Sequence, residues 1–399
     1  MINIKNVTDD ILWIGGSDRR LALFENLFPL PDGVSYNSYV VKDDKTIIFD
    51  TADVTIADQY VENLQAALAG AKPDYLVILH MEPDHCSQIS RVVSLYPDIK
   101  LVGGVQTFKF LHQFFPELDD AKKVTVKEGD TLDTANHSFG FVAAPMVHWP
   151  EVLLAFDTKT GTLFSADAFG TFGSVDSGIF ADDYDFEKDF LDDARRYYAN
   201  IVGKYGAQVQ AVLKKAQGLS IERICPLHGP IWRKDLGWFI DKYDKWSQCV
   251  PETEDILIVY GSMYGHTASA AETLAGLVHE IGGKKVRVFD VSKTDKSFLV
   301  GEAWRCGKIV LMAPTYNGGL YLPMESFIED LVALGLKNRK FALGQNGTWA
   351  PVAAKHMSDK LALLKDCTIL EDVLTITSAL HESDLDTVKN FAKAIADMA

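Results

Sequence analysis

The chain has 399 residues, of which 47% are hydrophobic and 24% are charged, and its formal net charge at pH 7 is −16. This length predicts two or three domains of ordinary globular composition, and the acidic balance disfavours binding to nucleic acid or to an anionic membrane. No apolar run approaches the ~20 residues of a membrane span, no signal peptide is present, and five cysteines without a CxxC pair favour a reducing compartment, so we expect a cytoplasmic protein.

The first 250 residues alternate short strands with helices. Their apolar patterns predict a hairpin over 36–41 and 46–50 and an amphipathic helix over 56–68. Further strands are predicted at 101–103, 124–126, 139–144 and 152–156, and a long helix at 186–205. Hairpins combined with βα units predict two packed sheets covered by helices, an αββα sandwich.

A cluster of metal-ligand side chains follows the apolar run 75–79. The stretch His80-Met81-Glu82-Pro83-Asp84-His85 places two imidazoles and two carboxylates in one short loop. A solvated polar loop is the simpler interpretation, but such residues after a buried strand are rarely buried unless they pair or coordinate. The cluster therefore predicts a metal site.

Three later residues repeat this pattern. His148, Asp167 and His228 each follow an apolar segment, at 141–147, 162–166 and 224–227 respectively. Because sites form where strands end and loops begin, we expect these residues to converge on the first four. The seven candidates exceed the ligands of one metal, which predicts two metals that share a bridging acid such as Asp167.

The rhythm of the chain changes after residue 250. The polar segment 249–255 contains a proline and predicts a boundary between a domain of residues 1–250 and one of residues 251–399. Strand and helix then alternate, with strands at 256–260, 285–291, 308–313, 340–344 and 367–374 and helices at 267–281, 327–334, 353–364 and 384–398. This alternation predicts a small doubly wound domain with a parallel sheet.

Three loops of the second domain fall at the same end of its predicted sheet. The first, 261–267, joins a strand to a helix and offers backbone N–H groups with the hydroxyls of Ser262 and Thr267, which suits one phosphomonoester. It lacks the lysine of a nucleoside triphosphate loop. The loops 313–321 and 344–349 add Tyr316 and Trp349, whose rings can stack on a flat ring system.

Together these loops resemble the flavodoxin pattern for flavin mononucleotide (FMN). The resemblance implies that FMN is bound by Ser262, Met263, Tyr264, Gly265, His266, Thr267, Pro314, Thr315, Tyr316, Asn317, Gly318, Gly319, Asn346, Gly347, Thr348 and Trp349. Ordinary tight turns are the alternative for each loop taken alone.

The ligand cluster resembles the metallo-β-lactamase superfamily pattern His-x-His-x-Asp-His, followed by His, Asp and His. Glu82 stands where that pattern has its second histidine, and a carboxylate there moves the preference from zinc towards iron or manganese. The variant with Glu, together with the flavodoxin-like loops, resembles the flavodiiron proteins, also called A-type flavoproteins. The fold implied is a metallo-β-lactamase-like αββα sandwich followed by a flavodoxin-like doubly wound sheet.

This resemblance implies an oxidoreductase that reduces dioxygen to water, nitric oxide to nitrous oxide, or both. One iron would be held by His80, Glu82 and His148, the other by Asp84, His85 and His228, and Asp167 would bridge. Electrons would reach the irons through FMN from a separate donor such as rubredoxin. A head-to-tail homodimer, or a dimer of dimers, would bring one chain's flavin to the other chain's irons.

Two other functions compete with this prediction. The first is a binuclear metallohydrolase with an appended flavodoxin-like domain, against which Glu82 argues. The second is a pure electron carrier, against which the complete ligand set argues. The segment 169–172, directly after Asp167, is a candidate wall for a gas pocket, with ordinary packing as the alternative.

Overall fold

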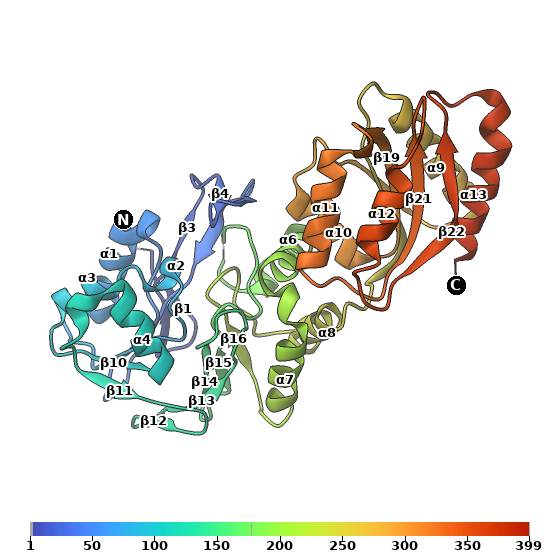
Figure 1. Cartoon of the computed structure of the whole chain (residues 1–399). Helices are drawn as coiled ribbons and strands as arrows, with labels where there is room; N and C mark the ends of the chain where they lie inside the picture. The colour runs from blue at the N-terminus through green and yellow to red at the C-terminus, as the bar shows by residue number, and fades with distance from the viewer. Residues whose placement is uncertain (1–2, 177, 399) are drawn as a thin grey trace. The chain divides into compact units, whose positions relative to one another are not determined.

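The computed structural model describes residues 3–176 and 178–398 (Figure 1). These form two compact units, one of Met1–Tyr198 with Ala207–Asp244, the other of Ala199–Gly206 with Lys245–Ala399. Among the described residues, no helix is both long and apolar enough to cross a membrane.

The first unit contains two large sheets. The seven-stranded sheet has the order β1 (Lys5–Asn6), β2 (Ile11–Trp13), β7 (Tyr39–Val41), β8 (Ile47–Phe49), β9 (Tyr75–Val77), β10 (Lys100–Gly103) and β11 (Lys123–Thr125). The five-stranded sheet has the order β12 (Thr131–Asp133), β13 (Ser138–Ala143), β14 (Leu153–Asp157), β15 (Thr162–Phe164) and β16 (Arg223–Cys225). Two small ribbons pair β3 (Gly16–Asp18) with β6 (Val34–Tyr36) and β4 (Leu23–Phe24) with β5 (Phe28–Pro29).

Aromatic rings fill the space between the two large sheets. Phe49 of the first sheet stacks on Phe164 of the second, with ring centroids 3.9 Å apart, and Tyr39 meets Phe164 edge-on at 5.4 Å. All three rings are fully buried, so they remove a large apolar area from water. The predicted sandwich is confirmed.

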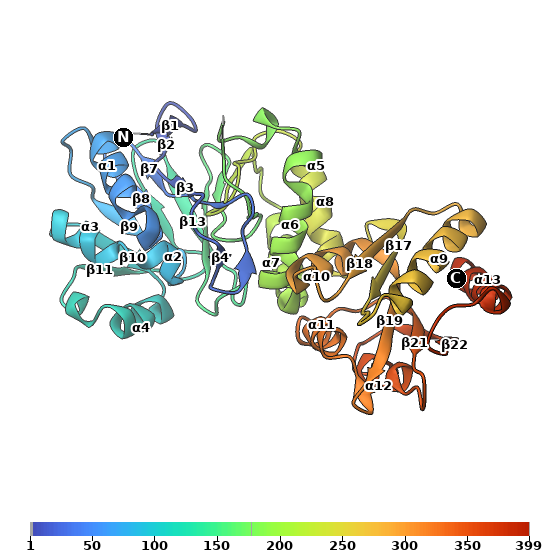
Figure 2. The ribbon, with the colours of Figure 1, turned by 90° about the horizontal axis from the view of Figure 1, so that it is seen from above.

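Helices cover both outer faces of this sandwich. The helices α1 (Ala57–Leu68), α3 (Ile89–Leu95) and α4 (Val105–Phe114) lie over the seven-stranded sheet, and α7 (Gly206–Ala216) and α8 (Leu236–Ser247) lie beside the five-stranded one (Figures 1 and 2). The helix α1 presents Tyr60, Leu64 and Leu68 to the core at spacings of four, as its sequence pattern predicts.

The single helix predicted over 186–205 is wrong. The chain instead forms α5 (Phe186–Asp189), α6 (Leu191–Tyr197), a π-helical segment Tyr198–Val202 and a 3-10 turn Gly203–Tyr205 before α7. Phe190 leaves the helical conformation, with φ −133°, and buries its ring against Phe186 and Tyr184. Apolar spacing alone does not reveal where the hydrogen-bonding step of a helix changes.

The second unit is built on a parallel sheet with the order β18 (Val286–Asp290), β17 (Thr253–Tyr260), β19 (Cys306–Tyr316), β21 (Lys340–Asn346) and β22 (Thr368–Ile376). The short β20 (Gly319–Leu320) pairs antiparallel with β19. In chain order this is 2-1-3-4-5, the arrangement of doubly wound sheets of the flavodoxin type. The predicted fold class is confirmed.

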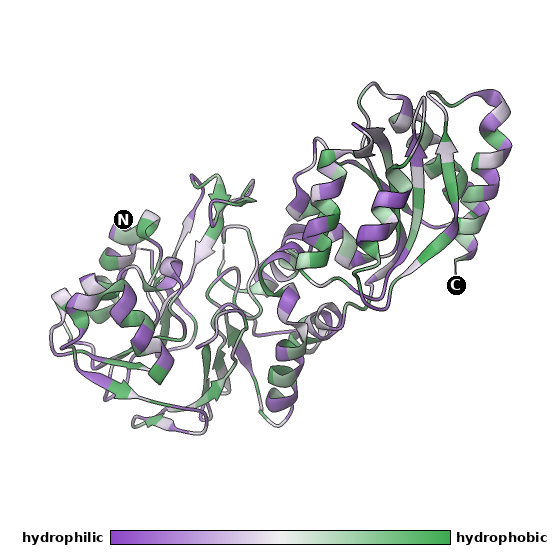
Figure 3. Cartoon of the chain, viewed as in Figure 1, coloured by the Kyte–Doolittle hydropathy of each residue, from purple (hydrophilic) through white to green (hydrophobic). Residues whose placement is uncertain are grey.

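Helices flank both faces of this parallel sheet. The helices α9 (His266–Gly282) and α13 (Leu385–Asp397) cover one face, and α10 (Lys296–Arg305), α11 (Leu322–Ala333) and α12 (Ala353–Leu361) cover the other (Figure 1). Leu274 and Phe391 bury against Ile258 and Val310 of the central strands. In Figure 3 the helices α11 and α12 carry alternating polar and apolar stripes, the pattern of half-buried helices. The sequence pattern did not predict α10.

Candidate metal centre and flavin site

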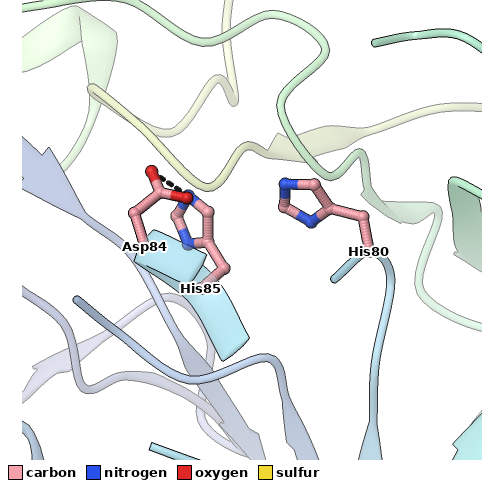
Figure 4. Close-up of side chains that lie close together, drawn as sticks. All are labelled: His80, Asp84 and His85. Atoms are coloured by element: carbon pink, nitrogen blue, oxygen red, sulfur yellow. Dashed lines mark ion pairs between the residues drawn. The ribbon is translucent and has the colours of Figure 1, made fainter. Parts of the chain in front are cut away.

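The predicted ligand cluster begins just beyond the end of β9. His80 lies three residues after this strand and is fully buried. The sequence predicted a loop for the residues that follow. They form instead the short helix α2 (Pro83–Cys86), which starts with a proline at its first turn. This turn carries Asp84 and His85 side by side, and His80 approaches from the strand end (Figure 4).

The three downstream residues lie against this cluster. His148 Nε2 is 2.9 Å from Glu82 Oε2 and 3.1 Å from Asp167 Oδ2. His228 Nε2 is 3.2 Å from Asp84 Oδ2, which is also 3.3 Å from His85 Nε2. The structure thus brings all seven predicted ligand residues together, from the ends of four different strands.

The Asp167 carboxylate lies between two groups of these side chains. Its Oδ2 faces His148 at 3.1 Å and His80 at 3.4 Å. Its Oδ1 faces His85 at 3.6 Å and His228 at 3.8 Å. One oxygen for each group is the arrangement of a carboxylate that bridges two metal ions.

Several of these polar atoms are buried without a hydrogen-bond partner among residues 3–176 and 178–398. They are both ring nitrogens of His80, Nδ1 of His85, both carboxylate oxygens of Asp84, and Oδ1 of Asp167. Buried polar atoms without partners are costly. Three of these atoms, His80 Nε2, Asp84 Oδ2 and Asp167 Oδ1, face other side chains of the cluster, so cations placed among them would satisfy these atoms. A donor set of imidazoles and carboxylates without thiolate suits iron. The residues present therefore fit a pair of iron ions.

The neighbouring cysteines do not join this donor set. Cys86 donates its thiol proton to the carbonyl oxygen of Met81 at 3.2 Å, and burial raises the pKa of that thiol. Burial likewise raises the pKa of the Cys225 thiol. Both are buried thiols, as the sequence predicted.

Without metal, the ligand residues form ion pairs. Burial raises the pKa of Asp167, but the charge of His80 and the hydrogen bond from His148 outweigh it and hold that pKa well below its usual range. Burial lowers the pKa of His148, but hydrogen bonds with Asp167 and Glu82 raise it to about 10. Metal binding would displace the protons that these imidazoles hold.

Residues that hold the ligands in place escaped the sequence prediction. The carbonyl oxygen of Ser35 accepts a hydrogen bond from His228 Nδ1 at 2.8 Å, which leaves Nε2 of that ring aimed at the site. Glu151 Oε1 accepts from the backbone N–H of Met81 at 2.8 Å, and Asp50 Oδ1 accepts from that of Leu79 at 2.9 Å. None of these residues stands in a pattern that sequence reading associates with metal sites.

Glu25 is a further neighbour that the sequence did not reveal. It lies in the turn between β4 and β5 with φ 51°, and part of its side chain is exposed. Its carboxyl faces Glu82, and burial followed by the charge of Glu82 raises its pKa to about 8. Asn26 beside it also has positive φ, so the hairpin turn sets the position of this carboxyl.

The second unit holds a cavity of about 560 Å³ among the three predicted loops. Its lining includes every residue predicted to bind FMN except Gly265 and Gly319, and it adds Ala350 and Ser378. Ser378 follows β22, a strand whose loop the prediction left out, and its carbonyl oxygen accepts a hydrogen bond from Asn346 Nδ2 at 3.1 Å. The omission arose because nothing in the 377–381 sequence resembles a phosphate or flavin loop.

The lining of this cavity combines polar groups with aromatic rings. Polar groups come from the turn before α9, where Gly265 has φ +92° and donates its N–H to Ser262 Oγ at 3.1 Å. The N-terminus of the seventeen-residue helix α9 begins there, and it would stabilise a phosphate. At the open rim of the cavity, Tyr264 is 87% exposed and Trp349 is 81% exposed. A ring stacked on them would remove this apolar surface from water. The residues present fit FMN.

Comparison with known proteins agrees with this description. Residues 34–229 match the ODP family beta lactamase, and residues 258–390 match the flavodoxin family. A nitric oxide reductase of Moorella thermoacetica is 29% identical over 395 residues, which cover 98% of this chain and 97% of that protein. An anaerobic nitric oxide reductase flavorubredoxin of Vibrio vulnificus is 30% identical over 367 residues, which cover 90% of this chain and 72% of the relative.

Solved structures share the whole fold. The flavodiiron protein of Giardia intestinalis has a TM-score of 0.92 at 23% identity, over 99% of this chain and 96% of that one. The rubredoxin oxygen:oxidoreductase of Desulfovibrio gigas has a TM-score of 0.91 at 24% identity, over 99% of this chain and 98% of that one.

The fold and the two sites define a class: an oxidoreductase that combines a binuclear metal centre with a flavin domain. The chain belongs to the flavodiiron protein family, so its cofactors are FMN and a pair of non-haem irons.

Proposed function

We propose that this chain reduces dioxygen to water, nitric oxide to nitrous oxide, or both, with electrons that reach the diiron site from FMN. The observation that carries the proposal is the occurrence on one chain of seven converged ligand residues and a cavity suited to FMN. The relatives named above act on nitric oxide or on oxygen, which supports this choice of substrates.

Electron counting favours the combination of these two sites. Four electrons and four protons convert dioxygen to two waters, and two of each convert two nitric oxides to nitrous oxide and one water. FMN carries two electrons, and the irons, when bound, supply two more together with open positions for a diatomic gas. A hydrolase needs no flavin, so the cavity in the second unit argues against the metallohydrolase.

We propose that one iron is held by His80, Glu82 and His148, the other by Asp84, His85 and His228, and that Asp167 bridges them. The division of the Asp167 contacts between its two oxygens supports this assignment. His85 Nε2 and His228 Nε2 lie 2.9 Å apart, so at least one of them points a lone pair at a shared proton or cation. The Ser35 carbonyl oxygen fixes the tautomer of His228.

We propose that FMN occupies the cavity described above, contacting the fourteen predicted residues that line it, with its phosphate at the turn 261–267. The hydroxyl of Thr267 lies 3.3 Å from Asn346 Nδ2, which ties the phosphate turn to the third loop. In this proposal residues 1–250 form the diiron domain and residues 251–399 the FMN domain.

The donor and the assembly also belong to the proposal. A rubredoxin, or another separate donor, would reduce FMN, as relatives named flavorubredoxin and rubredoxin oxygen:oxidoreductase suggest. A head-to-tail homodimer, or a dimer of dimers, would pair each flavin with the irons of the partner chain. Free cysteines at all five positions agree with a cytoplasmic protein.

The Asp167→Ala variant tests this function. In protein purified without oxygen, wild type is expected to hold about two irons and one FMN per chain and to consume gas when a donor is supplied. Loss of the bridge should lower gas consumption about 100-fold or more, because the two oxygens of Asp167 face both groups of ligands, while FMN reduction continues at the wild-type rate. Asp189→Ala, an exposed carboxylate at the end of α5, is the control.

Three outcomes would contradict the proposal. Wild type that contains zinc in place of iron, or that binds no flavin, is not a flavodiiron reductase. Gas consumption that survives in Asp167→Ala would mean that Asp167 is not the bridge. Steady-state rates measured separately with dioxygen and nitric oxide decide which gas this chain prefers.

A further inference from the structure

An apolar cavity lies in the first unit, apart from the metal ligands. It has a volume of about 270 Å³ and is lined by residues of the five-stranded sheet and of the helices α7 and α8. Leu163 and Ile224 of the sheet form its floor, and Leu213, Ala216 and Ile240 of the two helices form its walls. Gln217 is its one lining side chain with a polar group.

The lining becomes more buried from the mouth to the floor. Leu213 and Ala216 at the mouth are half-buried, whereas Leu163 is 3% and Ile224 0% exposed. Phe169, which also lines the cavity, is 6% exposed. The cavity is therefore a funnel from the surface of the unit into its interior.

The inner part of this funnel lies next to the metal ligands along the chain. The strand β15 carries Leu163 and ends three residues before Asp167, and β16 carries Ile224 and ends three residues before His228. Phe169 itself follows Asp167 by two residues. The strands that floor the cavity thus also deliver ligands to the metal centre.

Phe169 is held firmly at this inner end. Its backbone N–H donates to the Tyr243 hydroxyl at 2.7 Å, and its ring lies 4.4 Å from the Tyr243 ring. Its φ of +67° belongs to the left-handed region, which a bulky residue adopts only when its surroundings fix it. Phe169 thus links the two sites: it lines the cavity and follows Asp167 by two residues, in a turn where the main-chain oxygen of Asp167 accepts the N–H of Gly170 at 3.0 Å.

We propose that this cavity takes up the neutral diatomic gas, dioxygen or nitric oxide, and supplies it to the diiron site past Phe169. The inference rests on the proposed function. Uncharged diatomic gases favour apolar surroundings over water, and an apolar cavity of only about 150 Å³ stays dry and binds xenon or benzene. The lining offers almost no hydrogen bonds to water or ions, so it selects for such a gas.

Xenon binding tests the cavity without reference to activity. Crystals of the iron- and FMN-loaded protein, pressurised with xenon, are expected to show xenon against Leu163 and Ile224. A crystal in which the cavity stays empty of xenon or is filled by ordered water would overturn the proposal.

The Ala216→Phe variant tests supply of the gas. Its ring should fill the mouth, so that kcat/KM for the gas falls about tenfold while kcat at saturating gas is unchanged, the pattern of impaired access. Ala211→Phe places the same ring on an exposed position of the same helix and should leave both constants at wild-type values. Iron content, FMN content and the rate of FMN reduction should match wild type in both variants, and xenon should be lost only from Ala216→Phe.

The outcomes separate this inference from the function on which it rests. If wild type consumes neither gas, the proposed function itself fails. If wild type consumes a gas and Ala216→Phe keeps the full kcat/KM for it, the function stands and the supply route fails. Rates with dioxygen and with nitric oxide, measured separately, show which of the two gases the cavity serves.

Discussion

At the scale of single residues, the nature of one side chain decides which metal this site prefers. Glu82 Oε2 lies 2.9 Å from His148 Nε2 and 3.6 Å from His80 Nε2, so its carboxylate belongs to the same group as two imidazoles. A second carboxylate beside Asp167 adds negative charge and hard oxygen donors. Both favour iron over zinc, whose sites are richer in nitrogen and sulfur.

The Glu82→His variant should therefore bind more zinc relative to iron. It restores the His-x-His-x-Asp-His order and removes one negative charge from the centre. When apoprotein is offered equal ferrous iron and zinc without oxygen, we expect the iron-to-zinc ratio to fall about tenfold. Metal analysis by mass spectrometry measures the ratio, and Glu187→His, an exposed position on α5, is the control. An unchanged ratio would mean that Glu82 does not select the metal.

At the scale of secondary-structure elements, the His137 side chain fastens the first two strands of the first unit to the five-stranded sheet. This imidazole is fully buried, with Nδ1 2.7 Å from Asp157 Oδ2 of β14 and Nε2 3.2 Å from Asp10 Oδ2 in the turn between β1 and β2. Burial lowers the pKa of His137, but the hydrogen bond and charge of Asp157, and then the charges of Asp10 and Asp43, raise it above its ordinary value.

This contact should make stability depend on pH. Because the pKa of His137 is higher in the folded than in the unfolded chain, its contribution is complete below the unfolded pKa of about 6.5 and is lost as pH rises through the folded pKa. His137→Gln should lower the free energy of unfolding of the first unit by about 3 kcal/mol at pH 6, since Asp157 stays buried without its cation, and by less at pH 9.

Denaturant unfolding of wild type and variant at both pH values measures this difference. His112→Gln is the matched control, because His112 also pairs with an aspartate, Asp119 at 2.9 Å, but on the surface. We expect His112→Gln to lower the free energy of unfolding by no more than about 0.5 kcal/mol at either pH. If His137→Gln lowers the free energy of unfolding equally at pH 6 and pH 9, the charge of His137 is not what holds the strands.

The helix α9 offers a second test at this scale, with two glycines in opposite roles. Gly265 precedes the helix with φ +92°, whereas Gly276 lies within it, and a Cβ at either position would meet no atom within 4 Å. Gly265→Ala should therefore cost about 1 kcal/mol of stability through backbone strain alone. Gly276→Ala should raise the free energy of unfolding by about 0.5–1 kcal/mol, because alanine favours the helical conformation more than glycine does.

Only the first of these substitutions should affect FMN. A shifted turn at residue 265 misplaces the backbone N–H groups at the phosphate, so the Kd for FMN should rise several-fold, while Gly276→Ala keeps the wild-type value. Flavin fluorescence titration measures both. Equal FMN affinities in the two variants would mean that the turn 261–267 does not bind the phosphate.

At the scale of the whole molecule, the sequence allowed most of the architecture to be predicted. His80, Asp167 and His228 each follow a predicted strand, and they pointed to one site because functional sites form where strands end and loops begin. The structure brings these residues together, although β9 belongs to one sheet and β15 and β16 to the other. What escaped prediction depends on three-dimensional neighbours. Ser35 offers only a carbonyl oxygen, Glu25 reaches the site through a hairpin turn, and Ser378 lines the flavin cavity from a loop with ordinary composition.

The break of the predicted helix 186–205 has a related cause. Phe186, Phe190 and Tyr197 keep a helical spacing in the sequence, so the pattern continues where the backbone does not. The choice between one helix and several depends on the tertiary partners of Phe190 and on the π-helical segment, which no local pattern encodes. Strands and long periodic helices were predicted well because their signal is local.

The proposed dimer can be tested by combining two inactive chains. Asp167→Ala keeps its flavin but loses the metal bridge, and Ser262→Glu keeps the irons but puts a carboxylate against the FMN phosphate. If electrons pass between chains of a head-to-tail dimer, an equal mixture assembled together should recover about a quarter of wild-type gas consumption, since half of the dimers are mixed and each has one complete pair.

Transfer within one chain leads to a different result for the same mixture. Each chain then lacks one of the two sites it needs, so the mixture should stay as inactive as either variant alone. Mixing the two variants after each has been assembled separately is the control, because stable dimers do not exchange chains during the assay. Recovery in the co-assembled sample alone would establish that the flavin of one chain serves the irons of the other.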